Sequence, residues 1–324
     1  PYAVATGNSF ILKPSEQDPL VPERLFELIA EAGFPDGVVQ LVNGSVDTVD
    51  AILEHDGIEG ISFVGSTPVA RTIYEKGATN GKRVQAQGGA KNHVIVTETA
   101  DLAFAAEKSV SSALACAGER CLANDLVLVE ESVYEEMVDL VVAEAEAQVV
   151  GNGLDEETTV GALISPEHEQ RVRNYVETGV QEGADLVLDG RDAAVEGHEA
   201  GNFLAPCVFR DVEPDMVIAR EELFGPILGL MPVAGLVEAI DILNGSDFGN
   251  AASLFTGSGA DARQFRHDAQ AGNLAVNAGT AAPMAFFHFG GEKDSFFGDL
   301  HAQAEDVVRF YTDETVYIER WPDS

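Results

Sequence analysis

Short apolar runs typical of buried strands alternate with amphipathic runs typical of helices along most of the chain. The expected strands cover residues 9–12, 38–42, 60–64, 83–87, 125–129, 186–188, 202–209, 227–232, 251–255 and 273–277. The expected helices cover residues 22–31, 47–53, 68–76, 102–117, 133–149, 167–182, 236–243 and 261–272. This alternation predicts an α/β fold in which parallel strands are joined by right-handed crossovers.

The chain carries a large excess of acidic side chains. Its 324 residues include 55 Asp and Glu against 19 Lys and Arg, which gives a formal net charge of −36. Such a charge repels nucleic acids and anionic membranes, so we expect neither as a partner. Self-repulsion destabilises a compact chain in dilute buffer, and concentrated salt screens it. The composition therefore favours a halophilic source over an ordinary acidic mesophilic protein.

Three cysteines, without the spacing of a disulfide framework, indicate a reducing, cytoplasmic location. We expect Cys116 and Cys207 to be small buried side chains. Cys121 lies between a helical run and a strand, where Gly118 can end the helix and the Arg120 guanidinium can favour the thiolate. Cys121 is therefore the candidate nucleophile. The histidines show no ligand spacing, so we expect no metal.

Three turns carry side chains suited to a dinucleotide, and each also has a plainer interpretation. Ser66 opens a proline-initiated helix whose N–H groups suit a pyrophosphate, or it forms an ordinary capped turn. Lys13 and Glu16 can hold ribose hydroxyls, with the carboxylate favouring NAD over NADP, or they form a solvated charged turn. Glu222 and Phe224 can border a nicotinamide, or they mark a helix end before a buried strand.

Taken in order, five segments resemble the aldehyde dehydrogenase family. These segments are residues 13–16 (KPSE), 63–67 (FVGST), 89–91 (GAK), 118–121 (GERC) and 222–226 (ELFGP). Residues 89–93, 282–287 and 296–301 resemble the branch of methylmalonate-semialdehyde dehydrogenases. The resemblance extends over essentially the whole chain.

The resemblance implies three structural parts. Residues 1–91 would form a Rossmann-type NAD-binding domain that is incomplete at its N-terminus, and residues 92–303 an α/β catalytic domain. Residues 304–324 would form an oligomerisation strand, in which 315–318 is the expected strand, so we expect a homo-oligomer, either a dimer or a tetramer. The chain would also lack the N-terminal third of the family, including the asparagine that completes its oxyanion hole.

The resemblance also gives the three turns a common role in binding NAD. Lys13 and Glu16 would bind the adenosine ribose, and Ser66 would lie at the pyrophosphate. Glu222 and Phe224 would border the nicotinamide.

Cys121 would attack the carbonyl carbon of methylmalonate or malonate semialdehyde, and NAD would take the hydride. Gln87 stands where hydrolytic members carry the glutamate that activates water, and an amide is not a general base. The acyl group would therefore pass to coenzyme A, giving propionyl-CoA or acetyl-CoA and CO2. Arg120 is the candidate for the substrate carboxylate, or it only tunes Cys121. A hydrolytic aldehyde dehydrogenase with another base, and an inactive NAD-binding relic, remain alternatives.

Overall fold

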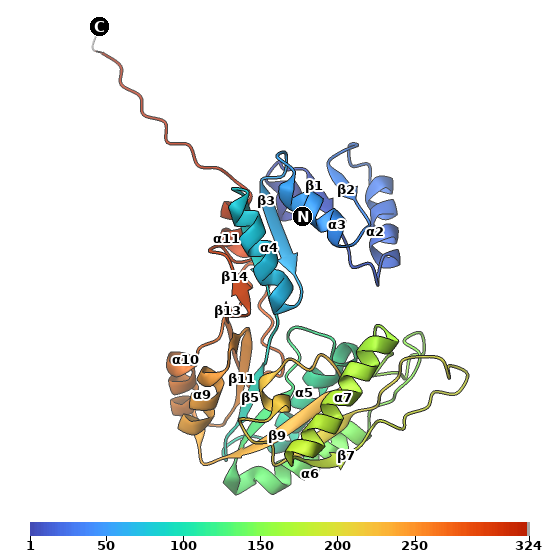
Figure 1. The fold of residues 1–324 in the computed structure, drawn as a ribbon. Coiled ribbons are helices and arrows are strands. Elements are labelled where there is room, and N and C mark those ends of the chain that lie inside the picture. Colours follow the sequence, from blue (N-terminus) through green and yellow to red (C-terminus); the bar gives the residue numbers. More distant parts are fainter. Residues whose placement is uncertain (323–324) are drawn as a thin grey trace.

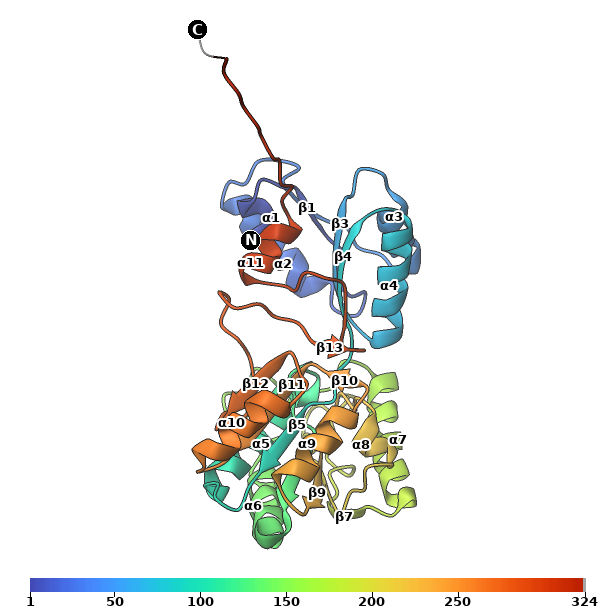
Figure 2. The ribbon, with the colours of Figure 1, turned by 90° about the vertical axis from the view of Figure 1, so that its left-hand side faces the viewer.

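The structure is a computed structural model that describes residues 1–322. Two lobes are stacked along the long axis of the molecule and joined by narrow crossing segments (Figures 1 and 2). The upper lobe contains residues 1–88 and a returning segment, residues 296–311. The lower lobe contains the residues between them.

Two small sheets lie in the upper lobe. The strands are β1 (Phe10–Leu12), β2 (Val39–Leu41), β3 (Gly60–Val64), β4 (Arg83–Gln87) and β14 (Phe296–Phe297). The helices are α1 (Tyr2–Ala5), α2 (Leu20–Glu31), α3 (Val46–Glu54), α4 (Thr67–Thr79) and α11 (Ala304–Phe310). β1 pairs with β2 in parallel, and β4 lies between β3 and β14. A small core that includes Leu53, Ile73 and Ala86 joins α3 and α4 to the second sheet.

The lower lobe is built on a seven-stranded sheet with the order β12-β11-β5-β6-β9-β8-β7. Its strands are β5 (His93–Val96), β6 (Leu126–Glu130), β7 (Asp185–Leu188), β8 (Cys207–Arg210), β9 (Ile227–Val233), β11 (Ala251–Phe255) and β12 (Asn273–Val276). All neighbouring pairs in this sheet are parallel except β7 with β8. The predicted α/β class with a mostly parallel sheet is confirmed.

Helices cover both faces of the seven-stranded sheet. They are α5 (Leu102–Leu114), α6 (Tyr134–Glu146), α7 (Pro166–Glu182), α8 (Val217–Arg220), α9 (Leu236–Gly245) and α10 (Gly259–Asp268), with the 3-10 turns η1 (Ala115–Gly118) and η2 (Glu131–Val133). Because the crossovers are right-handed, α5 and α6 lie on one face and α9 and α10 on the other. The central strands are apolar on both faces and form the main core with these helices. A short antiparallel pair, β10 (Phe248–Gly249) with β13 (Glu292–Lys293), lies at the edge of the lobe nearest the upper one (Figure 2).

The chain crosses between the lobes twice. It descends from β4 through residues 88–92 into β5, and it returns from β13 into β14. The two crossings touch, because the N–H of Gly88 donates to the carbonyl of Ser295 at 2.9 Å. The domain boundary predicted at residue 303 stays a prediction. In the structure β14 pairs with β4, and Arg83 of β4 donates a hydrogen bond to the carbonyl of Phe310 in α11 at 3.0 Å.

Some predicted elements differ from the structure. The helix expected over 102–117 ends at Leu114, and the strand expected over 202–209 is only β8. β5, in the middle of the sheet, was not predicted. The expected strand over 315–318 is not formed within the described chain, where the tail is extended and its Val316, Tyr317 and Ile318 side chains are exposed. Its pairing with another copy stays a prediction. No helix within residues 1–322 is long and apolar enough to cross a membrane.

Candidate active site

Cys121 lies in a loop between η1 and β6, at the edge of the lower lobe that faces the upper one. The chain leaves α5 at Leu114 and then takes a left-handed path, with φ of 55° at Cys116, 54° at Ala117 and 76° at Gly118. We predicted that Gly118 ends this helix. That prediction is wrong, because the helix ends four residues earlier, at Leu114. The left-handed turn also leaves Cys116 exposed, so the prediction that it is buried is wrong.

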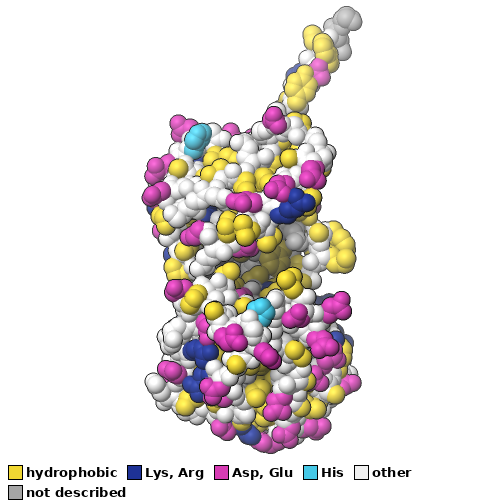
Figure 3. Space-filling view, turned by 90° about the vertical axis from the view of Figure 1, so that its right-hand side faces the viewer, with side chains coloured by type: hydrophobic (Ala, Val, Ile, Leu, Met, Phe, Trp, Pro, Cys, Tyr) yellow, Lys and Arg dark blue, Asp and Glu magenta, His cyan; other side chains and the backbone are white. Residues whose placement is uncertain are grey.

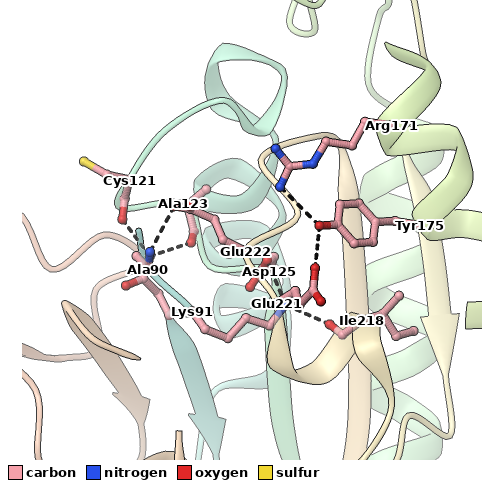
Figure 4. Close-up of polar contacts among 11 residues, drawn as sticks. Ala90, Lys91, Cys121, Ala123, Asp125, Arg171, Tyr175, Ile218, Glu221 and Glu222 are labelled. Carbon is pink, nitrogen blue, oxygen red and sulfur yellow. Dashed lines mark hydrogen bonds and ion pairs between the residues drawn. The ribbon is translucent and has the colours of Figure 1, made fainter. Parts of the chain in front are cut away.

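Two asparagine side chains hold the backbone of Cys121. Its carbonyl accepts hydrogen bonds from Asn92 Nδ2 at 2.9 Å and from Asn250 Nδ2 at 2.8 Å. Asn92 also donates to the carbonyl of Ala123 at 2.8 Å. In Figure 4 the carbonyl oxygen of Cys121 points toward Ala90 and the sulfur points away from it. The sequence analysis did not identify either asparagine, and the only signal was the position of Asn92 beside Lys91.

The Cys121 thiol is partly buried, and its pKa is raised. Burial is the largest cause, and the Glu222 carboxylate adds to it. Arg120 lowers the pKa of this thiol, as we predicted, but burial and Glu222 outweigh the effect. The free protein therefore holds Cys121 mainly as the neutral thiol near neutral pH.

Glu222 follows α8 and lies over the first crossing between the lobes. Its Oε1 atom accepts a hydrogen bond from the N–H of Ala90 at 3.0 Å. An added Cβ on Gly89 would lie 2.7 Å from Oε2, so a side chain there would require the Glu222 carboxylate to move. Burial raises the pKa of Glu222 to about 7, with Asp125 contributing and the Ala90 hydrogen bond opposing. Glu222 also lies close enough to Cys121 to affect the pKa of its thiol, and its place at the nicotinamide stays a prediction.

A buried ion pair lies beneath Glu222. Lys91 Nζ, fully buried, is 2.9 Å from Asp125 Oδ2 and donates to the carbonyl of Ile218 at 2.7 Å (Figure 4). Removing either charge would leave the other without its counter-ion inside the protein, which is costly. The pair therefore fixes the first crossing segment to the sheet and to α8.

Arg120 is turned away from the Lys91–Asp125 pair, toward the end of α5. Its guanidinium Nη2 donates to the carbonyl of Ser112 at 2.9 Å and to Thr280 Oγ1 at 3.0 Å. Its buried Nε has no hydrogen-bond partner among the described residues. Both bonds use Nη2, so the guanidinium donors on Nε and Nη1 are not engaged by Ser112 or Thr280.

The start of α4 reaches the active site through Thr67. Its Oγ1 accepts from the N–H of Gly89 at 2.8 Å and donates to the carbonyl of Asp294 at 3.1 Å. Ser66 precedes the helix as its N-cap, is exposed, and makes no capping hydrogen bond with its side chain. Ser66 is therefore free to contact a ligand, at a helix N-terminus that joins the segment beside Glu222. The sequence analysis did not assign a role to Thr67.

Lys13 and Glu16 follow β1 in the upper lobe. β1 belongs to a different sheet from β3, the strand that leads into α4. Lys13 Nζ lies 3.3 Å from Glu16 Oε2 and donates to the carbonyl of Gly44 at 2.6 Å. Backbone hydrogen bonding and Lys13 lower the pKa of Glu16. The pair forms a charged turn, and no contact links it to Cys121.

Phe224 stands in a left-handed conformation, with φ of 53°, in the loop after α8. Its carbonyl accepts a hydrogen bond from His168 Nε2 at 2.7 Å. His168 was not predicted from the sequence, because nothing in its local sequence marks it.

Gln87 is the last residue of β4. Its side chain is an amide and not a carboxylate, and its backbone carbonyl accepts a hydrogen bond from the N–H of Gly65 at 3.1 Å.

The molecular surface is hollowed between the two lobes, with hydrophobic side chains at the bottom of the hollow (Figure 3). A separate cavity of about 400 Å3 is lined by Asn152, His198 and Phe203, and contains none of the predicted site residues. Within residues 1–322 no group of three or more His, Cys, Asp or Glu side chains is arranged to hold a metal ion.

Comparison with known proteins connects these features. A profile of the aldehyde dehydrogenase family matches residues 1–316. Malonate-semialdehyde dehydrogenase 2 of Bacillus anthracis is 50% identical over 322 residues, which are 99% of this chain and 66% of that protein. The crystal structure of methylmalonate-semialdehyde dehydrogenase from Oceanimonas doudoroffii is 39% identical, with a TM-score of 0.97, covering 99% of this chain and 66% of that one.

An aldehyde dehydrogenase of Mycobacterium tuberculosis, solved with NAD+, is 33% identical, with a TM-score of 0.89 over 95% of this chain and 64% of that one. The chain thus spans 66% of the length of the malonate-semialdehyde dehydrogenase that it matches.

Proposed function

The chain belongs to the aldehyde dehydrogenase family, and from this premise we propose that it serves the NAD-dependent oxidation of methylmalonate or malonate semialdehyde. We further propose that the acyl group leaves on coenzyme A, giving propionyl-CoA or acetyl-CoA and CO2. The observation that carries the proposal is the partly buried Cys121 thiol beside Glu222, with an amide, Gln87, where a water-activating carboxylate would stand.

The residues of this chain fit NAD. Glu222 offers a carboxylate to ribose hydroxyls, in a position that a side chain at residue 89 would displace. The uncapped hydroxyl of Ser66 and the start of α4 suit the pyrophosphate, while Lys13 and Glu16 suit the adenosine ribose. When bound, NAD supplies the hydride acceptor.

Cys121 carries the covalent chemistry. Its sulfur, once ionised, would add to the aldehyde carbon and form the alkoxide of a hemithioacetal, which would become a thioester as its hydride passes to the acceptor. The two asparagines on its carbonyl hold the loop while the bond forms. Arg120 is the proposed cation for the substrate carboxylate, through guanidinium donors that Ser112 and Thr280 do not occupy.

Release of the acyl group depends on which nucleophile can ionise near the thioester. The amide of Gln87 does not accept a proton from water, whereas a thiol ionises without strong assistance. The thiolate of coenzyme A would attack the thioester carbonyl, and the Cys121 thiolate would leave. The carboxylate of the substrate is lost as CO2 before the product departs.

The proposed setting is a cytoplasmic homo-oligomer, a dimer or a tetramer. The three cysteines are free, which fits a reducing compartment. The extended tail, with exposed Val316, Tyr317 and Ile318, offers an unpaired strand to another copy. Sedimentation of the chain with and without residues 312–324 tests this part, and an unchanged mass would contradict it.

The test of the reaction is NADH formation from malonate semialdehyde in concentrated KCl, with and without coenzyme A. We expect sustained turnover only when coenzyme A is present. Turnover independent of coenzyme A, with a carboxylic acid as product, would establish hydrolysis instead. NAD binding without any NADH formation would indicate an inactive relic. Cys121→Ala is the control, and it should abolish hydride transfer while NAD still binds.

A further inference from the structure

His168 contacts two loops that meet at the active site. They are loop 116–121, which carries Cys121, and loop 222–226, which carries Glu222 and Phe224. It lies in the first turn of α7, where its backbone N–H donates to Ser165 Oγ, the N-cap, at 3.2 Å. Only 13% of its side chain is exposed. The imidazole is therefore anchored at the start of a long helix and turned into the protein.

One nitrogen of this imidazole serves both loops. His168 Nε2 is 2.7 Å from the carbonyl oxygen of Phe224 and 3.3 Å from Glu119 Oε1. Because a carbonyl only accepts, Nε2 carries the proton. The ring also stands edge-on to the Phe224 ring, with centroids 6.1 Å apart and an interplanar angle of 72°. His168 thus contacts the residue proposed to border the nicotinamide and the residue two positions before the nucleophile.

The two loops are strained and in direct contact. Ala117 and Phe224 both hold left-handed backbones, which a residue other than glycine keeps only when its surroundings enforce it. An added Cβ on Gly118 would lie 2.2 Å from the carbonyl oxygen of Gly225, so the backbones touch. An added Cβ on Gly225 would lie 2.6 Å from Val172 of α7. The helix that carries His168 therefore also supports this contact from behind.

We propose that His168 is a positioning residue that ties loop 116–121 to loop 222–226 and so fixes the Cys121 sulfur relative to the nicotinamide. The proposal rests on the function proposed above. Hydride transfer depends steeply on geometry, and a displacement of about 1 Å can cost about 10²-fold in rate. Glu119 is part of the tie, because its Oε1 also accepts from the N–H of Ile164 at 3.2 Å, which anchors it next to α7.

Three substitutions of His168 separate this role from general packing. His168→Ala removes the shared donor. His168→Gln places an N–H at nearly the same reach as Nε2, whereas the shorter His168→Asn does not reach both acceptors. His267→Ala is the matched control, since His267 lies in α10 with 88% of its side chain exposed.

The first measurement is hydrogen–deuterium exchange of the backbone amides in the two loops, which needs no turnover. We expect exchange about tenfold faster in both loops of His168→Ala and His168→Asn, because a lost tie lowers the cost of local opening. His168→Gln and His267→Ala should stay within about twofold of the wild type. Unchanged exchange in either loop of His168→Ala would overturn the proposal.

The second measurement is the burst of NADH formation at saturating NAD. His168→Ala should slow the burst by about 10- to 100-fold and leave the KM for coenzyme A within about twofold, with His168→Gln restoring the rate. If His168→Ala and His168→Gln both impair the burst rate and the KM for coenzyme A to the same extent, the effect is general destabilisation, and the proposal is overturned. If the wild type forms no NADH, the proposed function fails, and the exchange experiment still decides whether His168 ties the loops.

Discussion

The carboxylate of Glu222 opposes ionisation of the Cys121 thiol. Burial raises the pKa of Cys121 most, and Glu222 is the next cause. Because burial raises the pKa of Glu222 itself to about 7, its charge develops near neutral pH, in the range where the thiol must become reactive. Ionisation of Glu222 therefore raises the pKa of the thiol, and a cofactor that engages Glu222 would also change the reactivity of the sulfur.

Replacing Glu222 by Gln should make Cys121 more reactive in the absence of NAD. Below pH 7 the wild-type carboxylate is largely neutral and the two proteins should behave alike. Above pH 7 the wild type gains a negative charge that the variant lacks, so alkylation of the variant by iodoacetamide should be about 3- to 10-fold faster. Glu221→Gln is the matched control, since Glu221 bonds Tyr175 instead. Equal rates in the two variants would contradict the coupling.

His93 should make the protein sensitive to acid. It is buried in β5, and burial, followed by Lys91, lowers its pKa from 6.5 to about 3. The unfolded chain takes up this proton below pH 6.5 and the folded chain does not, so the stabilisation is complete above pH 6.5 and is lost as the pH falls toward 3.

Between about pH 7 and pH 5, the free energy of unfolding of the wild type should fall by about 2 kcal/mol more than that of His93→Gln. Denaturant titration at constant salt measures this difference. His267→Gln, which changes an exposed histidine, should follow the wild type. Parallel losses in the wild type and His93→Gln would show that other groups govern the acid response.

Gly118→Ala should destabilise the protein well beyond the cost of its backbone conformation. Gly183 provides the comparison, because it has a positive φ of 105° and no heavy atom within 4 Å of an added Cβ. Gly183→Ala should cost about 1–2 kcal/mol from the left-handed backbone alone. Gly118→Ala adds the collision with Gly225 and should cost about 1–3 kcal/mol more. Thermal or denaturant unfolding measures both, and equal costs would show that the two loops are not in tight contact.

Added KCl should raise the melting temperature. With a net charge of −36, screening of self-repulsion is the expected effect, and most of it should occur below about 0.5 M, where the Debye length changes most. Sucrose at equal osmolality is the control, since it does not screen charge. A melting temperature that does not rise with KCl would count against a salt-adapted protein.

The sequence predicted the fold well where apolar runs were long and bounded by turns. β11 was predicted over its full length, Ala251–Phe255, because five buried residues follow one another. β5 was missed because only Val94, Ile95 and Val96 are apolar, and a polar run precedes them. The tail at 315–318 has the residues of a strand, but a strand requires a hydrogen-bonding partner, which residues 1–322 do not supply.

The residues that carry the chemistry of the site were easier to predict than the residues that hold them in place. Cys121 stood out by residue type and position, and Glu222 only through the order of the five segments; in the structure Glu222 raises the pKa of the Cys121 thiol. Asn92, Asn250 and His168 could not be found in this way, because each acts on a backbone carbonyl that is distant in sequence. The exposure of Cys116 depends on a left-handed turn that its neighbours do not reveal.

The two crossings between the lobes have a mechanical consequence. The two crossing segments are bonded to each other by the N–H of Gly88 and the carbonyl of Ser295. The outgoing segment presents the Ala90 N–H to Glu222, and the returning one presents the Asp294 carbonyl to Thr67. The relative placement of the two lobes therefore also sets the positions of the groups that bond Glu222 and Thr67, so an error in one cannot arise without an error in the other.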